Sequence, residues 1–279
     1  MSANPIGWVE NRARDRRIPK LALREFWASR ELAYFFATRD LKVRYKQAIL
    51  GFAGVLLQPV IGALAFTFMF NGLAGIQTEG SYFMFALSGF VAWSFISGTI
   101  DGGANSLLEH DDLISHVRFP LLAAPVASIL VAFVDFAIGS VIVGALSVVV
   151  GDGISPVGLV VGFPAGVLLM SVFAMGPALI FAPLLVKYRD TGTLLGVGLQ
   201  VMFFLGPIAY PPELVGETWR HLQYLNPATG ALSLYRWGMI DAPAPAITDL
   251  VLSIAVSVTT ALFGLITFRR NEQTLVDVI

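Results

Sequence analysis

The chain has 279 residues, of which 56% are hydrophobic and 13% are charged, and its formal net charge is −1. A soluble domain carries about twice this charged fraction, so the composition excludes an ordinary soluble protein and favours the bilayer as solvent. A net charge near zero gives no support for a nucleic-acid partner, and the absence of cysteine excludes disulfides, thiolate nucleophiles and cysteine-ligated metals.

The N-terminal segment is basic. Residues 1–46 hold eleven Lys or Arg and no short apolar stretch with a small-residue cleavage site, so we expect a retained cytoplasmic segment. Two sets of side chains recur at helical spacing within it: Leu32, Phe35 and Phe36, and Arg39, Lys42 and Lys46. This sorting predicts an interface helix over 29–46, with aromatic rings at the acyl boundary and cations at the phosphates. The alternative is a topogenic basic segment with no further role.

Six stretches between charges are long enough to cross a hydrocarbon core, which takes about 20 mostly apolar residues. The predicted spans are residues 52–74, 82–104, 120–150, 157–184, 190–209 and 248–268. With the N-terminus in the cytoplasm, sixteen of the 18 Lys and Arg lie on that side, and Arg220 and Arg236 lie outside. Both termini are therefore expected in the cytoplasm.

Two acids lie within the predicted spans. Asp135 lies in the middle of the third, where an unpaired charge is costly and a functional role is the general expectation. Asp101 lies near the inner end of the second, where water reaches it. Because the spans contain no basic residue, we favour protonated or paired acids that bond to neighbouring helices over a proton relay.

Two connections between spans have amphipathic character. Residues 105–119 mix leucines with acidic side chains, a pattern that fits a helix docking into a partner and an ordinary solvated loop helix equally well. Residues 211–240 are too polar to span but rich in apolar side chains, and the Asn226-Pro227 turn signal splits them. They predict two short outer helices, which either dip back into the bundle as a lid or lie passively among the headgroups.

No catalytic constellation stands out. His110, His116 and His221 lack metal-ligand spacing, and we interpret each as a hydrated loop histidine. The chain has no phosphate-binding G-x-x-x-x-G-K-[ST] loop, so any ATP must bind to another protein. Aromatic residues are frequent in the spans; such rings either slide along apolar faces of sugars or simply face lipid.

Six segments in order carry a resemblance to a known family. They are RDLKVRYKQAILGFAGVLLQP (39–59), FALSGFVAWSFISG (85–98), NSLLEHDDLISHVRFPLLAAPVAS (105–128), KYRDTGTLLGVGLQVMFFLGPIAYP (187–211), LNPATGALSLYRWGMI (225–240) and FRRNEQTLVDVI (268–279). The sequence resembles the type-2 ABC exporter permeases that export O-antigen, capsule and teichoic acid polymers.

The resemblance implies an all-α integral membrane protein with six transmembrane helices, an interface helix within residues 1–46 and a transmembrane domain over 47–279. It implies a homodimer with two copies of an ABC ATPase subunit, which binds ATP and Mg, so that this chain binds no cofactor. The implied substrate is polysaccharide linked to polyprenyl diphosphate, exported across the bacterial inner membrane. A type-2 permease for a small lipid or drug is the main alternative; a proton-coupled transporter and a membrane transferase fit less well.

The resemblance also assigns site residues. The ATPase-coupling helix at 105–119 includes Leu108, Glu109, Asp111, Asp112, Leu113 and His116. The lipid-phosphate contacts are Arg39, Lys42, Arg44 and Lys46. The channel aromatics are Phe66, Phe70, Trp93, Phe203 and Tyr210. The outer gate helices within 211–240 contribute Trp219, Tyr224 and Trp237.

Overall fold

The computed structural model describes residues 23–46, 51–73, 75, 80–110, 121–188, 190–208, 210 and 223–275. The elements in these ranges are helices: α1 (Leu23–Lys46), α2 (Gly51–Phe66), η1 (Thr67–Leu73), α3 (Tyr82–Glu109), α5 (Ala123–Val150), η2 (Gly158–Gly162), α6 (Phe163–Lys187), α7 (Thr191–Leu205), α9 (Pro227–Met239) and α10 (Ile247–Leu275). The all-helical prediction is confirmed for this part of the chain.

Five stretches of helix have the length and apolar composition of a membrane span. They are Leu56–Leu73, Tyr82–Glu109, Ala123–Val150, Gly158–Lys187 and Ile247–Glu272, and they match predicted spans one to four and six. The fifth predicted span corresponds to α7, which is apolar but has only 15 residues. At ~1.5 Å per residue α7 extends about 22 Å, less than a hydrocarbon core of roughly 30 Å.

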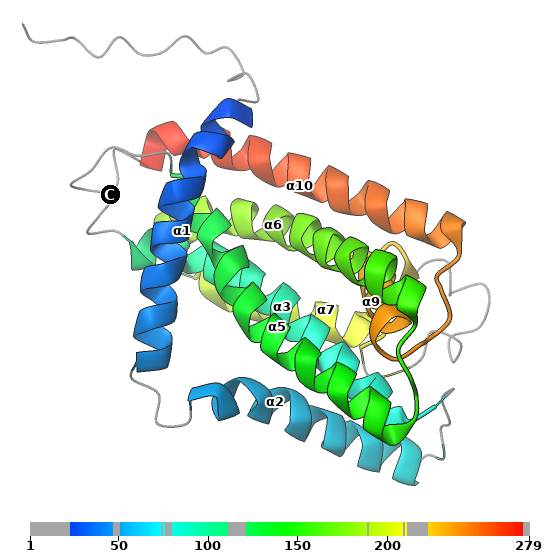
Figure 1. Cartoon of the computed structure of the whole chain (residues 1–279). Coiled ribbons are helices and arrows are strands. Elements are labelled where there is room, and N and C mark those ends of the chain that lie inside the picture. The colour runs from blue at the N-terminus through cyan, green and yellow to red at the C-terminus, as the bar shows by residue number, and fades with distance from the viewer. Residues whose placement is uncertain are drawn as a thin grey trace, which may run out of the picture.

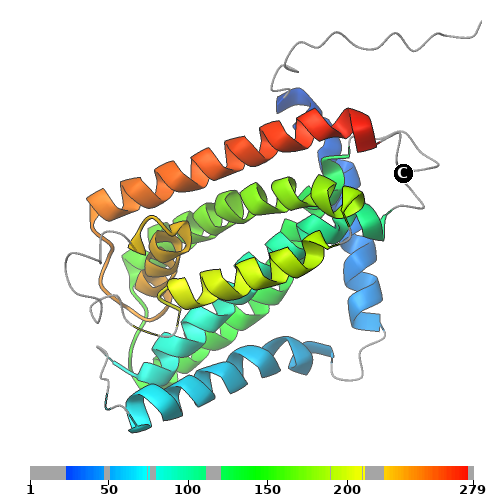
Figure 2. The same ribbon diagram turned by 180° about the vertical axis from the view of Figure 1, so that it is seen from behind.

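The long helices run between two ends of a bundle (Figures 1 and 2). α1 crosses one end, where α3 ends and α5 begins; we call this the α1 end. α9 lies at the opposite end, where α10 begins, and we call this the α9 end. α3 lies inside the bundle and packs against α5, α6 and α9, and most of its side chains are buried.

The peripheral helices expose apolar side chains at helical spacing. On α2 these include Leu57, Ile61 and Leu64, and on α10 they include Val258, Leu262 and Phe263. Such continuous apolar faces on long helices are suited to lipid contact, in agreement with the bilayer as solvent.

Two local signals bound the helices at the α9 end. The Asn226 side chain accepts a hydrogen bond from the Ala228 backbone N–H at 3.1 Å, and Pro227 occupies the first helical position of α9. Gly151 ends α5 in the left-handed conformation, φ 94°, and its N–H donates to the Ser147 carbonyl. The predicted turn at Asn226-Pro227 is thus the start of a helix.

α6 and α10 approach closely at two glycines, which gives a stability prediction. A Cβ added at Gly264 would lie 3.0 Å from the Gly176 Cα. We expect Gly264→Ala to destabilise the fold by roughly 1–3 kcal/mol, because the two helix backbones must separate. In contrast, Gly196 on α7 has open space around it, and Gly196→Ala should stabilise by up to about 1 kcal/mol through helix propensity. Apparent melting temperatures in detergent test the pair, and equal values for both variants would contradict the prediction.

Candidate functional site

A cavity of about 1010 Å³ lies between α1, α2, α3, α5 and α7. Its lining combines charged groups with aromatic rings, and the charged members are Arg39, Asp40, Arg44, Asp101, Glu109 and Asp135. Among the aromatic members are Phe90 and Trp93 on α3 and Phe203 on α7. A cavity that is lined by charged and aromatic side chains and bounded in part by membrane-spanning helices is a candidate transport site.

A line of polar residues follows one side of α3. The α3 polar stripe consists of Ser94, Ser97, Asp101, Asn105 and Glu109, of which all but Asn105 line the cavity. Their spacing of three or four residues places them on one helical face. Polar groups on a membrane-spanning helix are expected to face a cavity rather than lipid, because lipid cannot satisfy them.

The stripe presents mainly hydrogen-bond acceptors. The hydroxyl groups of Ser94 and Ser97 donate to the carbonyl oxygens of Phe90 and Trp93, at 2.9 and 2.8 Å. Asn105 Nδ2 donates to Asp101 Oδ1 at 3.2 Å. Ionised Asp and Glu side chains only accept hydrogen bonds. A serine hydroxyl that donates its proton to a backbone carbonyl can still accept a hydrogen bond through its oxygen. The stripe therefore suits a ligand that carries many donors.

Four of the five predicted channel aromatics form one cluster. The Phe66 ring lies 5.6 Å from that of Phe70 and 6.2 Å from that of Phe203, which lies 5.8 Å from Trp93. Of these four, Trp93 and Phe203 line the cavity. Tyr210 is apart from the cluster, with its hydroxyl donating to the Leu205 carbonyl at 3.2 Å. The channel role stays a prediction for all five.

The predicted phosphate contacts separate into two pairs. Arg39 and Arg44 line the cavity, whereas Lys42 and Lys46 are exposed on α1 and are not among its lining residues. Arg44 Nη1 lies 2.7 Å from Asp135 Oδ2, in a pair between α1 and α5. The interpretation of Asp135 as an acid paired to a neighbouring helix is confirmed, with a partner that comes from α1 rather than from a span.

Tyr45 completes this contact. Its hydroxyl donates to Asp135 Oδ1 at 2.5 Å, so that both carboxylate oxygens are engaged by consecutive residues of α1. Burial and the hydrogen bond to Asp135 raise the pKa of Tyr45 to about 12. The phenol consequently stays protonated and able to donate throughout the physiological pH range.

The face of α1 differs from the prediction at Phe36. Phe35 is 59% exposed, as expected for a ring at the acyl boundary, but Phe36 is 1% exposed inside the protein. Ala33 and Ala37 flank Phe36 and bring α1 close to the first turns of α5, which turns this ring inward. The prediction that both rings lie in lipid was wrong for Phe36.

The interpretation of His110 as a hydrated loop residue was wrong. His110 caps the end of α3, is 2% exposed, and packs edge-on against the Phe36 ring at 4.5 Å. Its Nδ1 lies 2.7 Å from the Ser106 carbonyl oxygen, and its Nε2 lies 3.5 Å from Asp40 Oδ1. A weak signal for this is that His110 follows Gly103 and Leu107, which are buried on α3, at spacings of four and three residues.

The predicted coupling residues lie at the α1 end as far as they are described. Leu108 and Glu109 belong to the last turn of α3 and are exposed. Asp111, Asp112, Leu113 and His116 lie outside the described residues. Residues 105–109 are thus continuous with α3, and the docking role of 105–119 stays a prediction.

The predicted outer-gate residues that are described lie at the α9 end. Tyr224 is 6% exposed, and its carbonyl accepts from Ser253 Oγ of α10 at 3.3 Å. Trp237 on α9 packs against η2, where a Cβ added at Gly162 would lie 2.7 Å from the indole ring. Trp219 lies outside the described residues, and the gate role of all three stays a prediction.

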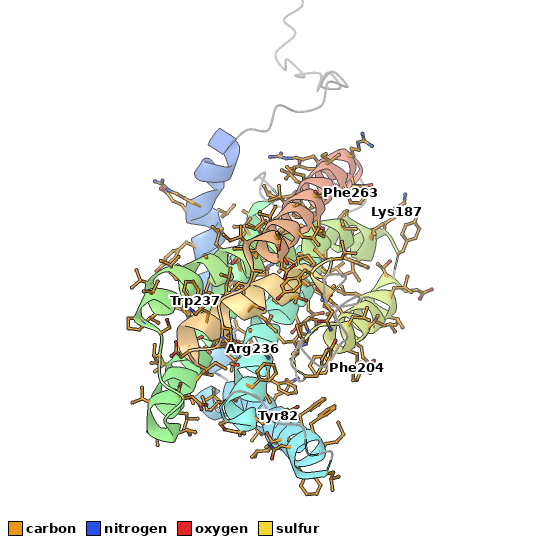
Figure 3. All side chains as sticks on the ribbon, turned by 90° about the vertical axis from the view of Figure 1, so that its right-hand side faces the viewer. Tyr82, Lys187, Phe204, Arg236, Trp237 and Phe263 are labelled. Atoms are coloured by element: carbon orange, nitrogen blue, oxygen red, sulfur yellow. The ribbon has the colours of Figure 1, made fainter. Side chains whose placement is uncertain are left out.

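Arg236 is the residue at this end that sequence reasoning missed, since it was counted only as an outer charge. It is 3% exposed. In Figure 3, which views the α9 end, it lies near the middle of the molecule, whereas Lys187 lies near the edge. Its guanidinium donates to the Pro207 and Ile208 carbonyls beyond α7, at 2.7 and 2.6 Å. It also donates to Phe85 O on α3 at 3.1 Å. Arg236 thereby ties α9, α3 and the end of α7 together.

Comparison with known proteins places these features in a family. The model of the ABC-2 type transporter family matches residues 32–240. The O-antigen export system permease protein RfbA of Myxococcus xanthus is 28% identical over 254 residues, which cover 90% of this chain and 96% of that protein. A protein of the same name from Klebsiella pneumoniae is 22% identical over 246 residues, which cover 87% of this chain and 94% of that protein.

Proposed function

The chain belongs to the ABC-2 type transporter family, and from this premise we propose that it is the membrane subunit of an exporter for lipid-linked polysaccharide. It is a multi-pass membrane protein and a transporter, not a catalytic enzyme on its own. The proposed substrate is a glycan on polyprenyl diphosphate, moved across the bacterial inner membrane. The similarity to two O-antigen export permeases over most of both chains supports this substrate class.

The observation that carries the proposal is the pairing of the α3 polar stripe with aromatic rings in one cavity. Sugars offer hydroxyl donors around their edges and apolar C–H faces. Ser97 and Asp101 supply acceptors for the former, and Trp93 and Phe203 supply ring surfaces for the latter. A cavity made for a purely apolar small lipid would have no use for a row of acceptors on a spanning helix.

The arrangement in the membrane follows from the same proposal. We place the α1 end at the cytoplasmic face, with both termini inside, and the α9 end outside, with α7 as a sixth crossing. A separate ABC ATPase, which binds ATP and Mg, docks on residues 105–119; the exposed Leu108 and Glu109 at the α1 end support this position. Two copies of the chain enclose the pathway, and residues 211–240 form its outer gate.

Conditional depletion of the protein tests the function directly. Lipid-linked glycans are measured by mass spectrometry in inside-out and right-side-out vesicles before and after depletion. We expect long polymer to accumulate on the cytoplasmic leaflet, because synthesis continues while export stops. An unchanged glycolipid pool, in a strain without a second exporter, would reject polysaccharide and favour a small lipid or drug as substrate.

A further inference from the structure

α1 contacts α5 at two places that differ in chemistry. The first is an apolar cluster of small side chains and one ring: Ala33, Phe36, Ala37, Ala123 and Ala127. These residues are buried, and the alanines allow the two helices to approach closely. An anion cannot compete for apolar contacts of this kind, so we expect this part of α1 to stay packed against α5. We call it the α1 pivot.

The second contact is polar, and we call it the α1 latch. Arg44 and Tyr45 bind the two carboxylate oxygens of Asp135, at 2.7 and 2.5 Å. The Arg44 side chain is 56% exposed and Asp135 is 15% exposed. A guanidinium that is this exposed gains little from a single carboxylate and has further N–H donors, so its partner can be exchanged.

The charges of the cavity restrict where an anion can bind. Four carboxylates line it, those of Asp40, Asp101, Glu109 and Asp135, against the two guanidinium groups of Arg39 and Arg44. An anion beside the α3 polar stripe meets the carboxylates of Asp101 and Glu109, whereas α1 offers both guanidinium groups against one carboxylate, that of Asp40. An anion therefore binds most favourably on the α1 side of the cavity. There, Arg44 is already paired with Asp135.

We propose that Asp135 is an internal competitor at an anion site formed by Arg39, Arg44 and Tyr45, and that a diphosphate group displaces it and opens the α1 latch. The proposal rests on the proposed function and deepens it, since the diphosphate is that of the lipid carrier. A diphosphate brings more charge and more acceptor oxygens than a carboxylate, and the planar guanidinium binds phosphate in a bidentate manner. Tyr45, protonated, donates to either partner. Displacement frees the second half of α1 while the α1 pivot stays in place.

Binding constants test the competition. The full chain in phosphatidylcholine nanodiscs is titrated with polyprenyl diphosphate, and with polyprenol as the control, by native mass spectrometry. We expect Asp135→Asn to bind the diphosphate about two- to fivefold more tightly, since the competitor is lost. Arg44→Gln should bind it about tenfold more weakly. The double variant should bind no more tightly than Arg44→Gln alone.

Glu31→Gln is the matched control, because it removes an exposed carboxylate of α1 that does not line the cavity. An equal gain in Glu31→Gln would show a general effect of net charge on diphosphate binding and overturn the competition. A gain that persists in the double variant would also overturn it.

Distances test the opening of the α1 latch independently of transport. The chain has no cysteine, so pairs of introduced cysteines take spin labels without background. We expect polyprenyl diphosphate to lengthen or broaden the distance between labels at Lys42→Cys, in the half of α1 that carries the α1 latch, and Val141→Cys on α5. The distance between Tyr34→Cys and Val141→Cys, next to the α1 pivot, should stay constant; all three sites are exposed. Asp135→Asn should produce the same change without lipid, and Tyr45→Phe, which keeps the ion pair and the fold, should produce part of it.

The outcomes separate this proposal from the function on which it rests. Diphosphate binding that is insensitive to Asp135→Asn overturns the competition and leaves polysaccharide export standing. A response to inorganic pyrophosphate but not to the lipid supports anion exchange at Arg44 and argues against a lipid carrier. No response of the distances or the affinities to either anion overturns the proposal.

Discussion

Arg236→Ala is expected to destabilise the protein by about 3–5 kcal/mol, because several hydrogen bonds to a buried charged group, each worth about 1.5–3 kcal/mol, are lost together. The guanidinium donates to three carbonyl oxygens and to Ser88 Oγ, and it stacks on the Phe85 ring at 3.6 Å. The Pro207 and Ile208 carbonyls follow the end of α7, where no helical turn satisfies them. Truncation leaves these acceptors buried without the donor that holds them, which is the costly case for a hydrogen bond. Apparent melting temperatures in nanodiscs should fall by roughly 6–20 °C.

Two further variants show whether the geometry or only the charge of Arg236 matters. Arg236→Lys keeps the charge but replaces the planar fork with a compact ammonium, so we expect it to recover less than half of the loss. Arg270→Ala removes an exposed arginine near the end of α10 and should change the melting temperature little. Wild-type stability of Arg236→Lys would show that the planar geometry of the guanidinium is not needed. Wild-type stability of Arg236→Ala would show that the hydrogen bonds of Arg236 do not stabilise the protein.

The sequence predicted the spanning helices well because hydrocarbon thickness sets their length and charges mark their ends. The predictions from the sequence were wrong for parts of the helices that lie outside the hydrocarbon core. α3 continues past the predicted end at residue 104 to Glu109, since a helix that leaves the membrane no longer needs apolar side chains. Likewise Phe35 and Phe36 share one helical face in the sequence, yet one is exposed and the other buried. Packing of small neighbours decided this, and periodicity alone does not report it.

The parts of the candidate site that lie close together in the sequence were predicted, and the contacts between residues far apart in the sequence were not. Arg39 and Arg44 were found because a cluster of cations is visible in a short window. The partner of Arg44 was not, because Asp135 is remote in sequence and only the fold joins them. The α3 polar stripe was present as a spacing of three and four from Ser94 to Glu109. It passed unnoticed because single serines barely lower the hydropathy of a span, and Asn105 and Glu109 lie after the predicted end at residue 104.

Replacing two acceptors of the α3 polar stripe by leucine, Ser97→Leu with Asp101→Leu, is expected to lower polysaccharide export about 10- to 100-fold. Each lost acceptor removes a hydrogen bond of about 1 kcal/mol or more to each sugar that passes. An increase of about 1.4 kcal/mol in the barrier to transport lowers the transport rate tenfold. Both side chains line the cavity, so leucine also narrows the route. Export is measured as polysaccharide at the cell surface per permease in the membrane, which separates transport from expression.

Thr259→Leu on α10 is the matched control for this loss. The Thr259 hydroxyl donates to the carbonyl four residues earlier at 2.7 Å, as Ser97 does at 2.8 Å, but it is exposed on an apolar helix and outside the cavity lining. We expect Thr259→Leu to export normally, because leucine on a lipid-facing helix costs nothing. The double stripe variant should still co-purify with its ATPase, since neither change touches the exposed end of α3. Normal export by the double variant would mean that the glycan does not pass along α3, and the transport path would then have to lie on another face of the helices.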